Sequence, residues 1–372
     1  MDWSTAQNIL CVRLDSLGDV LMTTPALAAI KASRPDSRLT LMTSAAGAAL
    51  APQLAMADDV WVYDAPWLKA TAPRQNSQPE QAVIEALRSR QFDAAIIFTV
   101  YSQNPLPTAF MAYMADIPLR LAHCRENPYQ LLTDTIRDPE PELTRHEVQR
   151  QLDLVASVGY RTADERLQIT VPKAAHQNVS SILKDLGISP ARPWIVVHPG
   201  ASAPSRRYPP ELFAEVGRSL VNQGIAVLFT GTAGECELVE SIRSQMVAPS
   251  HSLVGRLTLE ELSALLAAAP LLLSNNTGPV HIAAAVGTPV VDLYALTNLQ
   301  HTPWQVPHRV LFHDVPCRLC YRSICPEGHH NCLRLVEPET VVTAVLDLLP
   351  QGSLPNEPFL GASPALAEVQ PA

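Results

Sequence analysis

Short apolar runs alternate with helical patterns through residues 174–294, and this alternation restricts the fold more than any other feature. Runs of apolar residues at 194–198, 225–230, 271–274 and 290–294 are typical of strands. Strands that are apolar on both faces belong to parallel sheets covered by helices on each side. The second half of the chain therefore predicts an α/β fold, with helices at 174–186, 210–223, 235–246, 259–268 and 278–286.

The N-terminal half begins in the same way. Ile9–Arg13 predicts a strand, Val20–Ser33 a helix and Arg38–Met42 the next strand, which is the opening of a doubly wound domain. Further strands are expected at 60–63 and 94–99. Helices are expected at 79–89 and 145–158, and loops rich in proline and polar residues at 65–81 and 128–144.

The length of 372 residues accommodates two domains, each with its own core. We expect one Rossmann-like domain at 1–172 and a second at 173–350, joined near residues 165–175, with a cleft between them. Residues 351–372 are rich in Pro, Ser and Ala and poor in charge, which predicts a disordered tail.

The composition restricts the partners and the compartment. The chain has 27 basic and 36 acidic residues, a net charge of -9, whereas non-specific nucleic-acid binding needs a basic surface. The N-terminus lacks the pattern of a signal peptide, and the most apolar stretches, 262–274 and 282–296, are too short or interrupted to span a membrane. Seven cysteines without an export signal do not indicate a disulfide framework. We expect a soluble cytoplasmic protein that binds no nucleic acid and has no transmembrane segment.

Ligands of open parallel sheets bind at the carboxyl ends of the strands, and the first candidate loop there is 16–19. Gly18 permits a close backbone approach, and Asp19 lies at the start of a helix. Spacing alone favours a helix cap for Asp19, since Asp is common at that position. A single glycine also does not make the three-glycine dinucleotide fingerprint.

Two further loops lie in the second half. The loop 198–207 offers backbone N–H groups, a serine and the adjacent Arg206 and Arg207, whose guanidinium groups match phosphate geometry. The loop 274–278 begins the helix that contains His281, and a helix N-terminus after a buried strand suits an anion. A solvated basic turn and a simple helix cap are the respective alternatives. Two anion-suited loops in one domain favour a diphosphate ligand.

Four cysteines cluster near the C-terminus, at Cys317, Cys320, Cys325 and Cys332, with two histidines inside the cluster. The cluster is a candidate structural zinc or iron site. Only one Cys-x2-Cys pair is present, however, so reduced and partly buried cysteines are an equal alternative. We expect less than one equivalent of metal in the purified protein.

Several segments together resemble glycosyltransferase family 9, which contains the lipopolysaccharide core heptosyltransferases. These are RLDSLGDVLMTTPAL at 13–27, HPGAS at 198–202, RRYP at 206–209 and NTGPVHIAAA at 276–285, and the cysteine segment 317–333 is similar to one found in many members. The motifs occur in the expected order.

The resemblance implies a GT-B arrangement, in which two Rossmann-like domains face each other across a cleft. The first domain would bind a glycan or lipid-linked acceptor and the second a nucleotide sugar. The implied reaction is inverting transfer of a heptose from an ADP-heptose-type donor to a hydroxyl of the lipopolysaccharide core. No metal or other cofactor is implied, and peripheral contact with the inner face of the cytoplasmic membrane fits such an acceptor.

The resemblance also implies roles for single residues. Asp19 matches the catalytic base, and Glu235 would reach the ribose of the donor. The remaining donor contacts are Ser202, Arg206, Asn276, Thr277, Gly278 and His281. Two positions depart from well-characterised members: Arg206 replaces Lys and keeps the charge, and Asn276 replaces Asp. An amide can donate to a phosphate where a carboxylate cannot.

Two other functions are compatible with the same fold. A nucleotide-sugar epimerase would need further acid and base carboxylates in the cleft, and the sequence shows no clear set. A catalytically silent nucleotide-sugar-binding or assembly protein is left open by Asn276, while the presence of Asp19 disfavours it. A nicotinamide oxidoreductase is disfavoured because the three-glycine fingerprint is missing after the first strand.

Overall fold

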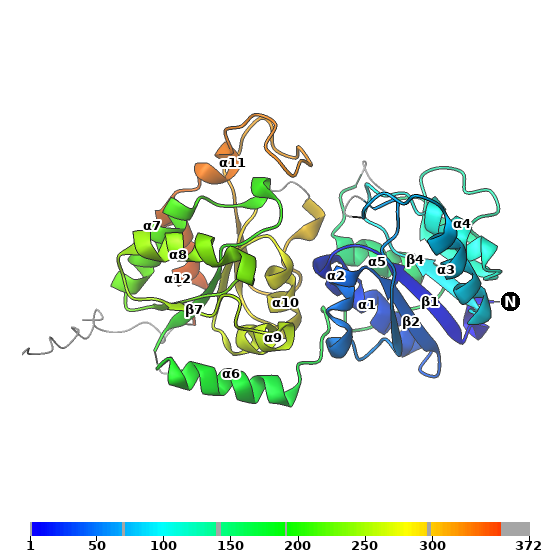
Figure 1. Ribbon diagram of the computed structural model, residues 1–372, viewed down its shortest axis with the longest axis horizontal. Helices are drawn as coiled ribbons and strands as arrows, with labels where there is room; N and C mark the ends of the chain where they lie inside the picture. The colour runs from blue at the N-terminus through cyan, green and yellow to red at the C-terminus, as the bar shows by residue number, and fades with distance from the viewer. Residues whose placement is uncertain (1, 69–70, 139–142, 190–191, 296–298, 351–372) are drawn as a thin grey trace, which may run out of the picture.

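The computed structural model describes residues 2–68, 71–138, 143–189, 192–295 and 299–350. The expected disordered tail at 351–372 lies outside these residues. Two α/β domains lie side by side, each with a six-stranded parallel sheet between helices (Figure 1). The expected α/β class with two Rossmann-like domains is confirmed.

The first sheet has the strand order β3-β2-β1-β4-β5-β6. Successive strands are added on one side of β1 as far as β3 and then, from β4, on its other side. The carboxyl end of β1 therefore lies at the switch point where ligands bind such sheets. The strands are β1 (Asn8–Arg13), β2 (Arg38–Thr43), β3 (Asp59–Val62), β4 (Ala94–Ile97), β5 (Leu119–His123) and β6 (Asp134–Ile136).

Alternate residues of β1 face opposite sides of this sheet. Ile9 and Cys11 join a core with the helices α1 (Leu17–Ser33) and α5 (Glu147–Ala156). Leu10 and Val12 join a second core on the other face, which α3 (Gln78–Ser89) and α4 (Leu106–Met114) cover. The short helix α2 (Ala45–Ala48) follows β2.

The second sheet repeats this plan, with the order β12-β11-β10-β7-β8-β9. Ile195 and Val197 of β7 face α7, α8 and α12, whereas Val196 faces α9 and α10. The strands are β7 (Trp194–His198), β8 (Ala226–Phe229), β9 (His251–Ser252), β10 (Leu272–Asn275), β11 (Val290–Leu293) and β12 (His308–Leu311). The helices are α6 (Lys173–Asp185), α7 (Pro210–Asn222), α8 (Cys236–Met246), α9 (Leu259–Ala268), α10 (Gly278–Val286), α11 (Asn331–Arg334) and α12 (Pro338–Leu348).

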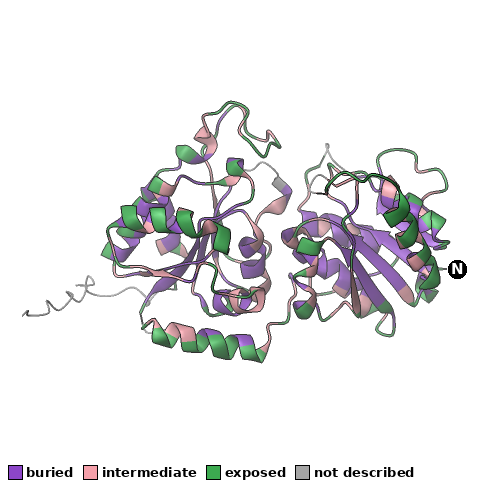
Figure 2. Cartoon of the chain, viewed as in Figure 1, coloured by how far each residue is buried: buried purple, intermediate pink, exposed green. Residues whose placement is uncertain are grey.

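The two domains meet where α1 packs against α10. One cluster of buried apolar residues includes residues of both helices, so this contact is part of the core. Figure 2 shows buried residues along the strands of both sheets. At the C-terminal ends of α1 and α10, beyond this contact, a cavity of about 800 Å³ lies between the domains. The chain crosses between the domains along residues 157–172, which precede α6.

Most predicted elements are present within a few residues of their expected ends. The prediction of a continuous loop at 128–144 is wrong, because this segment contains β6 at the sheet edge. Its three residues, Asp-Thr-Ile, are too short and polar to give a strand pattern. In the described part of the chain, no helix has both the length and the apolar character that crossing a bilayer demands.

Candidate active site

Asp19 lies in the first turn of α1, where its carboxylate makes two kinds of contact. The helix is capped by Ser16, whose backbone N–H and hydroxyl donate to Oδ2 of Asp19 at 3.1 and 2.6 Å. This is the ordinary chemistry of a helix start. The other oxygen, Oδ1, accepts from the guanidinium of Arg13 at 3.2 Å. Asp19 is therefore more than a cap, because it also belongs to a buried ion-pair network.

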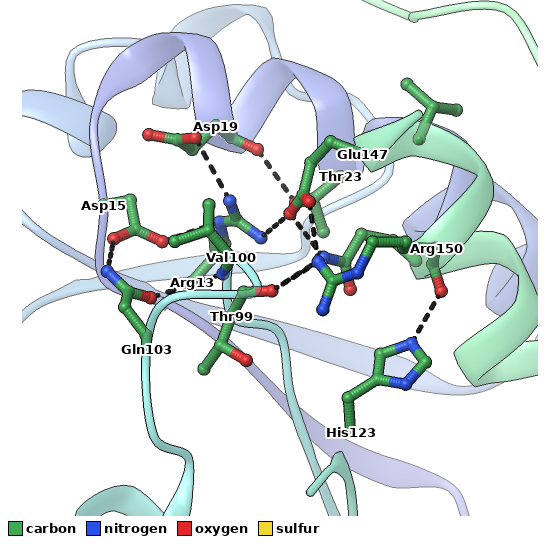
Figure 3. A network of polar contacts seen from close by, with 12 residues as sticks. Arg13, Asp15, Asp19, Thr23, Thr99, Val100, Gln103, His123, Glu147 and Arg150 are labelled. Atoms are coloured by element: carbon green, nitrogen blue, oxygen red, sulfur yellow. Dashed lines mark hydrogen bonds and ion pairs between the residues drawn. The ribbon is translucent and has the colours of Figure 1, made fainter. Parts of the chain in front are cut away.

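Arg13 is the centre of that network (Figure 3). Its side chain is fully buried at the end of β1 and pairs with three carboxylates: Asp15 at 2.9 Å, Glu147 at 2.7 Å and Asp19 at 3.2 Å. Glu147 begins α5 and is itself fully buried. A buried charge is costly unless it is paired and hydrogen-bonded. Arg13 and these acids therefore depend on one another for burial.

Arg150 completes the network on the far side of Glu147. It donates to Oε2 of Glu147 at 2.7 Å and to the carbonyl of Thr99 at 3.0 Å, and it also pairs with Asp138. The carbonyl of Arg150 accepts from the ring of His123 at 2.9 Å. Glu147 is thus held from both sides, and its position fixes the orientation of Arg13.

The surroundings lower the pKa of two of these carboxyls, Asp19 and Glu147, and raise the pKa of the third, Asp15. Burial opposes ionisation of Asp19, but Arg13 and His301 outweigh burial and hold the pKa of Asp19 below its usual range. Burial likewise opposes ionisation of Glu147, and the two arginines lower its pKa to about 2. Burial dominates at Asp15 and raises its pKa to about 6. Asp19 is therefore ionised at neutral pH.

A cavity of about 680 Å³ opens beside Asp19 on the first domain. Carboxylates, hydroxyls and one guanidinium line it among the described residues, with Asp15, Ser44, Asp64, Arg74 and Gln103 as the principal polar side chains. Such a surface can hydrogen-bond several sugar hydroxyls, and it places them next to the carboxylate of Asp19.

The start of α10 in the second domain meets the start of α1. A Cβ added at Gly18 would lie 2.8 Å from Cδ2 of His281, and one at Gly278 would lie 3.2 Å from Cδ2 of Leu17. Thr277 caps α10, yet its hydroxyl makes no capping hydrogen bond. The N-terminus of α10, the positive end of its helix dipole, therefore lies close to Asp19 across the domain contact.

Asn276 has a role inside the second domain. It is 2% exposed, and its amide nitrogen donates to Oδ2 of Asp292 and to the carbonyl of His301, both at 2.9 Å. Burial raises the pKa of Asp292 to about 8. From the family resemblance we expected this amide to contact the donor, whereas the structure directs it to Asp292 and His301.

The loop after β7 carries the other expected donor contacts. Ser202 is exposed, and Arg206 has no ion-pair partner among the described residues. Arg206 also acts electrostatically on His281, Asp292 and His301, which places its charge near the start of α10. Arg207, in contrast, donates to the carbonyl of Ala201 at 2.7 Å within the loop.

Glu235 lies next to this loop, since a Cβ added at Gly200 would be 1.8 Å from its Oε1. Its Oε2 accepts from the backbone and hydroxyl of Thr232 at 2.7 and 3.0 Å. One carboxylate oxygen thus shapes the helix start, and the other faces the loop. His281 is buried against Gly18, and burial lowers its pKa to about 3, so it is neutral.

The four clustered cysteines and His329 line a cavity of about 20 Å³ beside Ser205. Sγ of Cys317 lies 3.7 Å from Nε2 of His329. In the described ranges, no three His, Cys, Asp or Glu side chains are arranged to hold a metal ion. The segment supports the loop after β7 through Ser205. The backbone N–H of Ser205 donates to the carbonyl of Ser323 at 3.1 Å, and its hydroxyl donates to the carbonyl of Arg322 at 2.7 Å.

The model of glycosyltransferase family 9 (heptosyltransferase) matches residues 81–330, which is more than half of the chain. The chain belongs to glycosyltransferase family 9. The expected family and enzyme class are confirmed.

Relatives in this family are similar over most of the chain. Lipopolysaccharide heptosyltransferase 2 of Salmonella typhimurium is 26% identical, over 71% of this chain and 77% of the relative. The Escherichia coli enzyme of the same name is 27% identical, over 72% of this chain and 78% of the relative. Each aligned region is longer than either domain of this chain, so it includes parts of both.

Solved structures agree with the fold. A glycosyl transferase family 9 structure from Veillonella parvula has a TM-score of 0.77 at 22% identity and covers 94% of this chain and 98% of its own. The E. coli ADP-heptose lps heptosyltransferase II has a TM-score of 0.69 at 24% identity, with 92% and 98% covered. The expected GT-B arrangement is confirmed.

Sequence reasoning missed four residues of this region: Glu147, Arg150, Asp292 and His301. One signal pointed to Glu147. Arg13 ends the apolar run ILCVR, and an arginine in a buried strand needs buried acids as partners. The pattern did not say which acids, since Glu147 lies 134 positions away.

Proposed function

We propose that this enzyme is an inverting, metal-independent heptosyltransferase that transfers a heptose from an ADP-heptose-type donor to a hydroxyl of a lipopolysaccharide core acceptor. The observation that carries the proposal is the contact between the two helix starts. It brings an ionised carboxylate from the first domain next to the anion-suited end of α10 in the second.

Asp19 serves as the base. In a single displacement, the acceptor oxygen attacks C1 of the donor sugar, the bond from C1 to the diphosphate oxygen breaks, and ADP leaves. The proton of the acceptor hydroxyl passes to Asp19. Base catalysis of this kind contributes about 10²–10⁴ in rate. Because attack and departure occur on opposite faces of C1, the anomeric configuration inverts.

The second domain stabilises the leaving ADP. Negative charge grows on the diphosphate as the bond breaks, and prealigned N–H groups and a guanidinium stabilise such charge without reorganisation. The N-terminus of α10, the hydroxyl of Thr277 and Arg206, which has no ion-pair partner among the described residues, supply these groups. Ser202 and Glu235 lie on the same loops, and Glu235 is our candidate for the ribose contact.

The acceptor binds in the cavity of about 680 Å³ beside Asp19. Its carboxylates and hydroxyls suit a sugar with several hydroxyl groups. The named relatives act on lipopolysaccharide, which favours a lipid-linked core sugar for this chain too. We infer that the enzyme works in the cytoplasm, at the inner face of the membrane that holds such an acceptor.

The test is an assay of the purified full chain with ADP-heptose and a panel of other nucleotide sugars on lipopolysaccharide core acceptors. We expect heptose transfer from the ADP donor, a product of inverted anomeric configuration by NMR, and unchanged activity in EDTA. Release of free sugar alone, retention of configuration, or loss of activity in EDTA would each contradict the proposal.

A further inference from the structure

The segment 301–304 of the second domain is joined to the first domain at the start of α5. Nε2 of His146 hydrogen-bonds to the carbonyl of Thr302 at 2.9 Å. The rings of His146 and Trp304 stack, with centroids 4.4 Å apart and planes at 30°. Nε1 of Trp304 also donates to the carbonyl of Glu165 at 2.7 Å. These contacts connect the domains through polar groups, separately from the apolar packing of α1 on α10.

The same segment is fixed to the donor half of the site. The amide of Asn276, immediately before the cap of α10, donates to the carbonyl of His301 at 2.9 Å. That amide also donates to the buried Asp292. The position of residues 301–302 therefore depends on the start of α10, where the diphosphate is proposed to bind.

On the other side, His146 adjoins the network of the base. It caps α5, and the backbone N–H of Val148 donates to its Nδ1 at 3.2 Å. The next residue, Glu147, pairs with Arg13, and Arg13 pairs with Asp19. A shift of the start of α5 would therefore move Glu147 and turn Arg13, which orients the carboxylate of Asp19.

The hydrogen bonds of His146 identify its tautomer. Since Nδ1 accepts from Val148, the ring proton is on Nε2 and is donated to Thr302. Burial lowers the pKa of His146 to about 4, which keeps the ring in this neutral form. The two ring nitrogens thus have different roles, because Nδ1 caps a helix of the first domain and Nε2 binds the second domain.

We propose that His146 is a positioning residue for the transfer reaction: its hydrogen bond to Thr302 couples the donor-binding start of α10 to the Glu147–Arg13–Asp19 network. This inference rests on the proposed function, in which Asp19 is the base. When the bond is formed, the carboxylate of Asp19 keeps a fixed position relative to the bound donor. Without the bond, the base and the donor site move independently, and a displacement of about 1 Å costs as much as 10²-fold in rate.

Two substitutions separate the two roles of His146. In His146→Asn the amide oxygen replaces Nδ1 and keeps the cap, because Asn is a good N-cap, but the side chain is too short to reach Thr302. In His146→Gln the amide nitrogen replaces Nε2 and can still donate to Thr302, at the expense of the cap. The two variants are matched, since each retains one polar function of the imidazole and loses the ring stacking.

We expect the two variants to differ in opposite ways: one loses turnover and the other loses the helix cap. Both variants lose the ring stacking, which lowers the Tm of each. His146→Asn should keep an unchanged donor KM, while kcat falls by about 10- to 100-fold. His146→Gln should have a lower Tm from the lost cap and a kcat within about threefold of the wild type. A wild-type kcat in His146→Asn, an equal loss of kcat in both variants, or a change confined to donor KM would overturn the proposal.

Hydrogen exchange provides a measurement that does not depend on transfer. ADP binding should slow exchange of the amides at 147–150 in the wild type and in His146→Gln, but not in His146→Asn. If the wild type binds ADP and shows this protection yet transfers no heptose, the proposed function fails and the coupling stands. If ADP does not change exchange at 147–150 in the wild type, the coupling is wrong.

Discussion

The imidazole of His281 lies against the backbone of Gly18, leaving no room for a side chain: a Cβ there would be 2.8 Å from Cδ2 of His281. Since His281 is buried in α10, an added methyl group must push the two helix starts apart. We predict that Gly18→Ala folds and binds ADP normally but lowers kcat by about 10²-fold, measured by steady-state kinetics. Undiminished turnover would mean that this close approach is not needed for transfer.

The variant Asp19→Asn should remove the catalytic role of Asp19 while keeping its role at the helix start. The amide oxygen can still accept from Ser16, so the helix start and the ADP affinity measured by calorimetry should persist. We expect kcat to fall by at least about 10²-fold, because the amide cannot take the proton. Asp64→Asn, a matched change in the same cavity, should alter acceptor KM while leaving kcat near its wild-type value. Normal turnover of Asp19→Asn would reduce Asp19 to a helix cap.

Arg206→Ala removes the guanidinium that has no ion-pair partner in the described structure. We expect ADP binding to weaken by roughly 1.5–3 kcal/mol, the usual value for a hydrogen bond to a charged group, or about 10- to 150-fold in Kd. Arg218→Ala is the control, since Arg218 is exposed on α7. Equal ADP affinity in the Arg206 variant and this control would place the diphosphate elsewhere.

Asn276→Asp introduces the residue that the family resemblance implies at this position, and it should destabilise this chain. The new carboxyl would face Asp292 and the carbonyl of His301, which now receive the amide hydrogens. Two adjoining buried carboxyls can share one proton, so their folded-state pKa is raised and stability is lost as pH rises through it. We expect a Tm deficit larger at pH 8 than at pH 5.5.

The double variant Asn276→Asp/Asp292→Asn is the matched control for that experiment, because it exchanges the two groups and again leaves one amide beside one carboxyl. Its Tm should recover most of the deficit at both pH values. An Asn276→Asp protein as stable as the wild type at pH 8 would show that the pairing of residues 276 and 292 is unimportant.

The sequence predicts the positions of the loops better than the contacts within them. β7 and α10 follow from a continuous apolar run and from a Gly-Pro helix start, both of which are local signals. The edge strands β6 and β12 were not predicted, because they are half-exposed and lack such a run. Strand ends also predicted where the three candidate loops begin, since each follows the carboxyl end of a strand in one of the two parallel sheets.

Pairings between distant residues could not be predicted. Glu147, one of the three partners of Arg13, is 134 positions away, and the bond from His146 to Thr302 crosses 156 positions and two domains. The hydrogen bond between Asn276 and the buried Asp292 joins residues only 16 positions apart, but it could not be predicted either, because it depends on how β10 pairs with β11.

The pairing of Arg13 with Asp19 also has a kinetic consequence. In the proposed mechanism each transfer leaves one proton on Asp19, and the next cycle cannot begin until that proton departs. Arg13 makes Asp19 a weaker base, yet for the same reason the protonated acid is a stronger one and gives up its proton readily to water at neutral pH. Regeneration of the carboxylate is then fast, and the slow step of turnover is left to bond cleavage or product release.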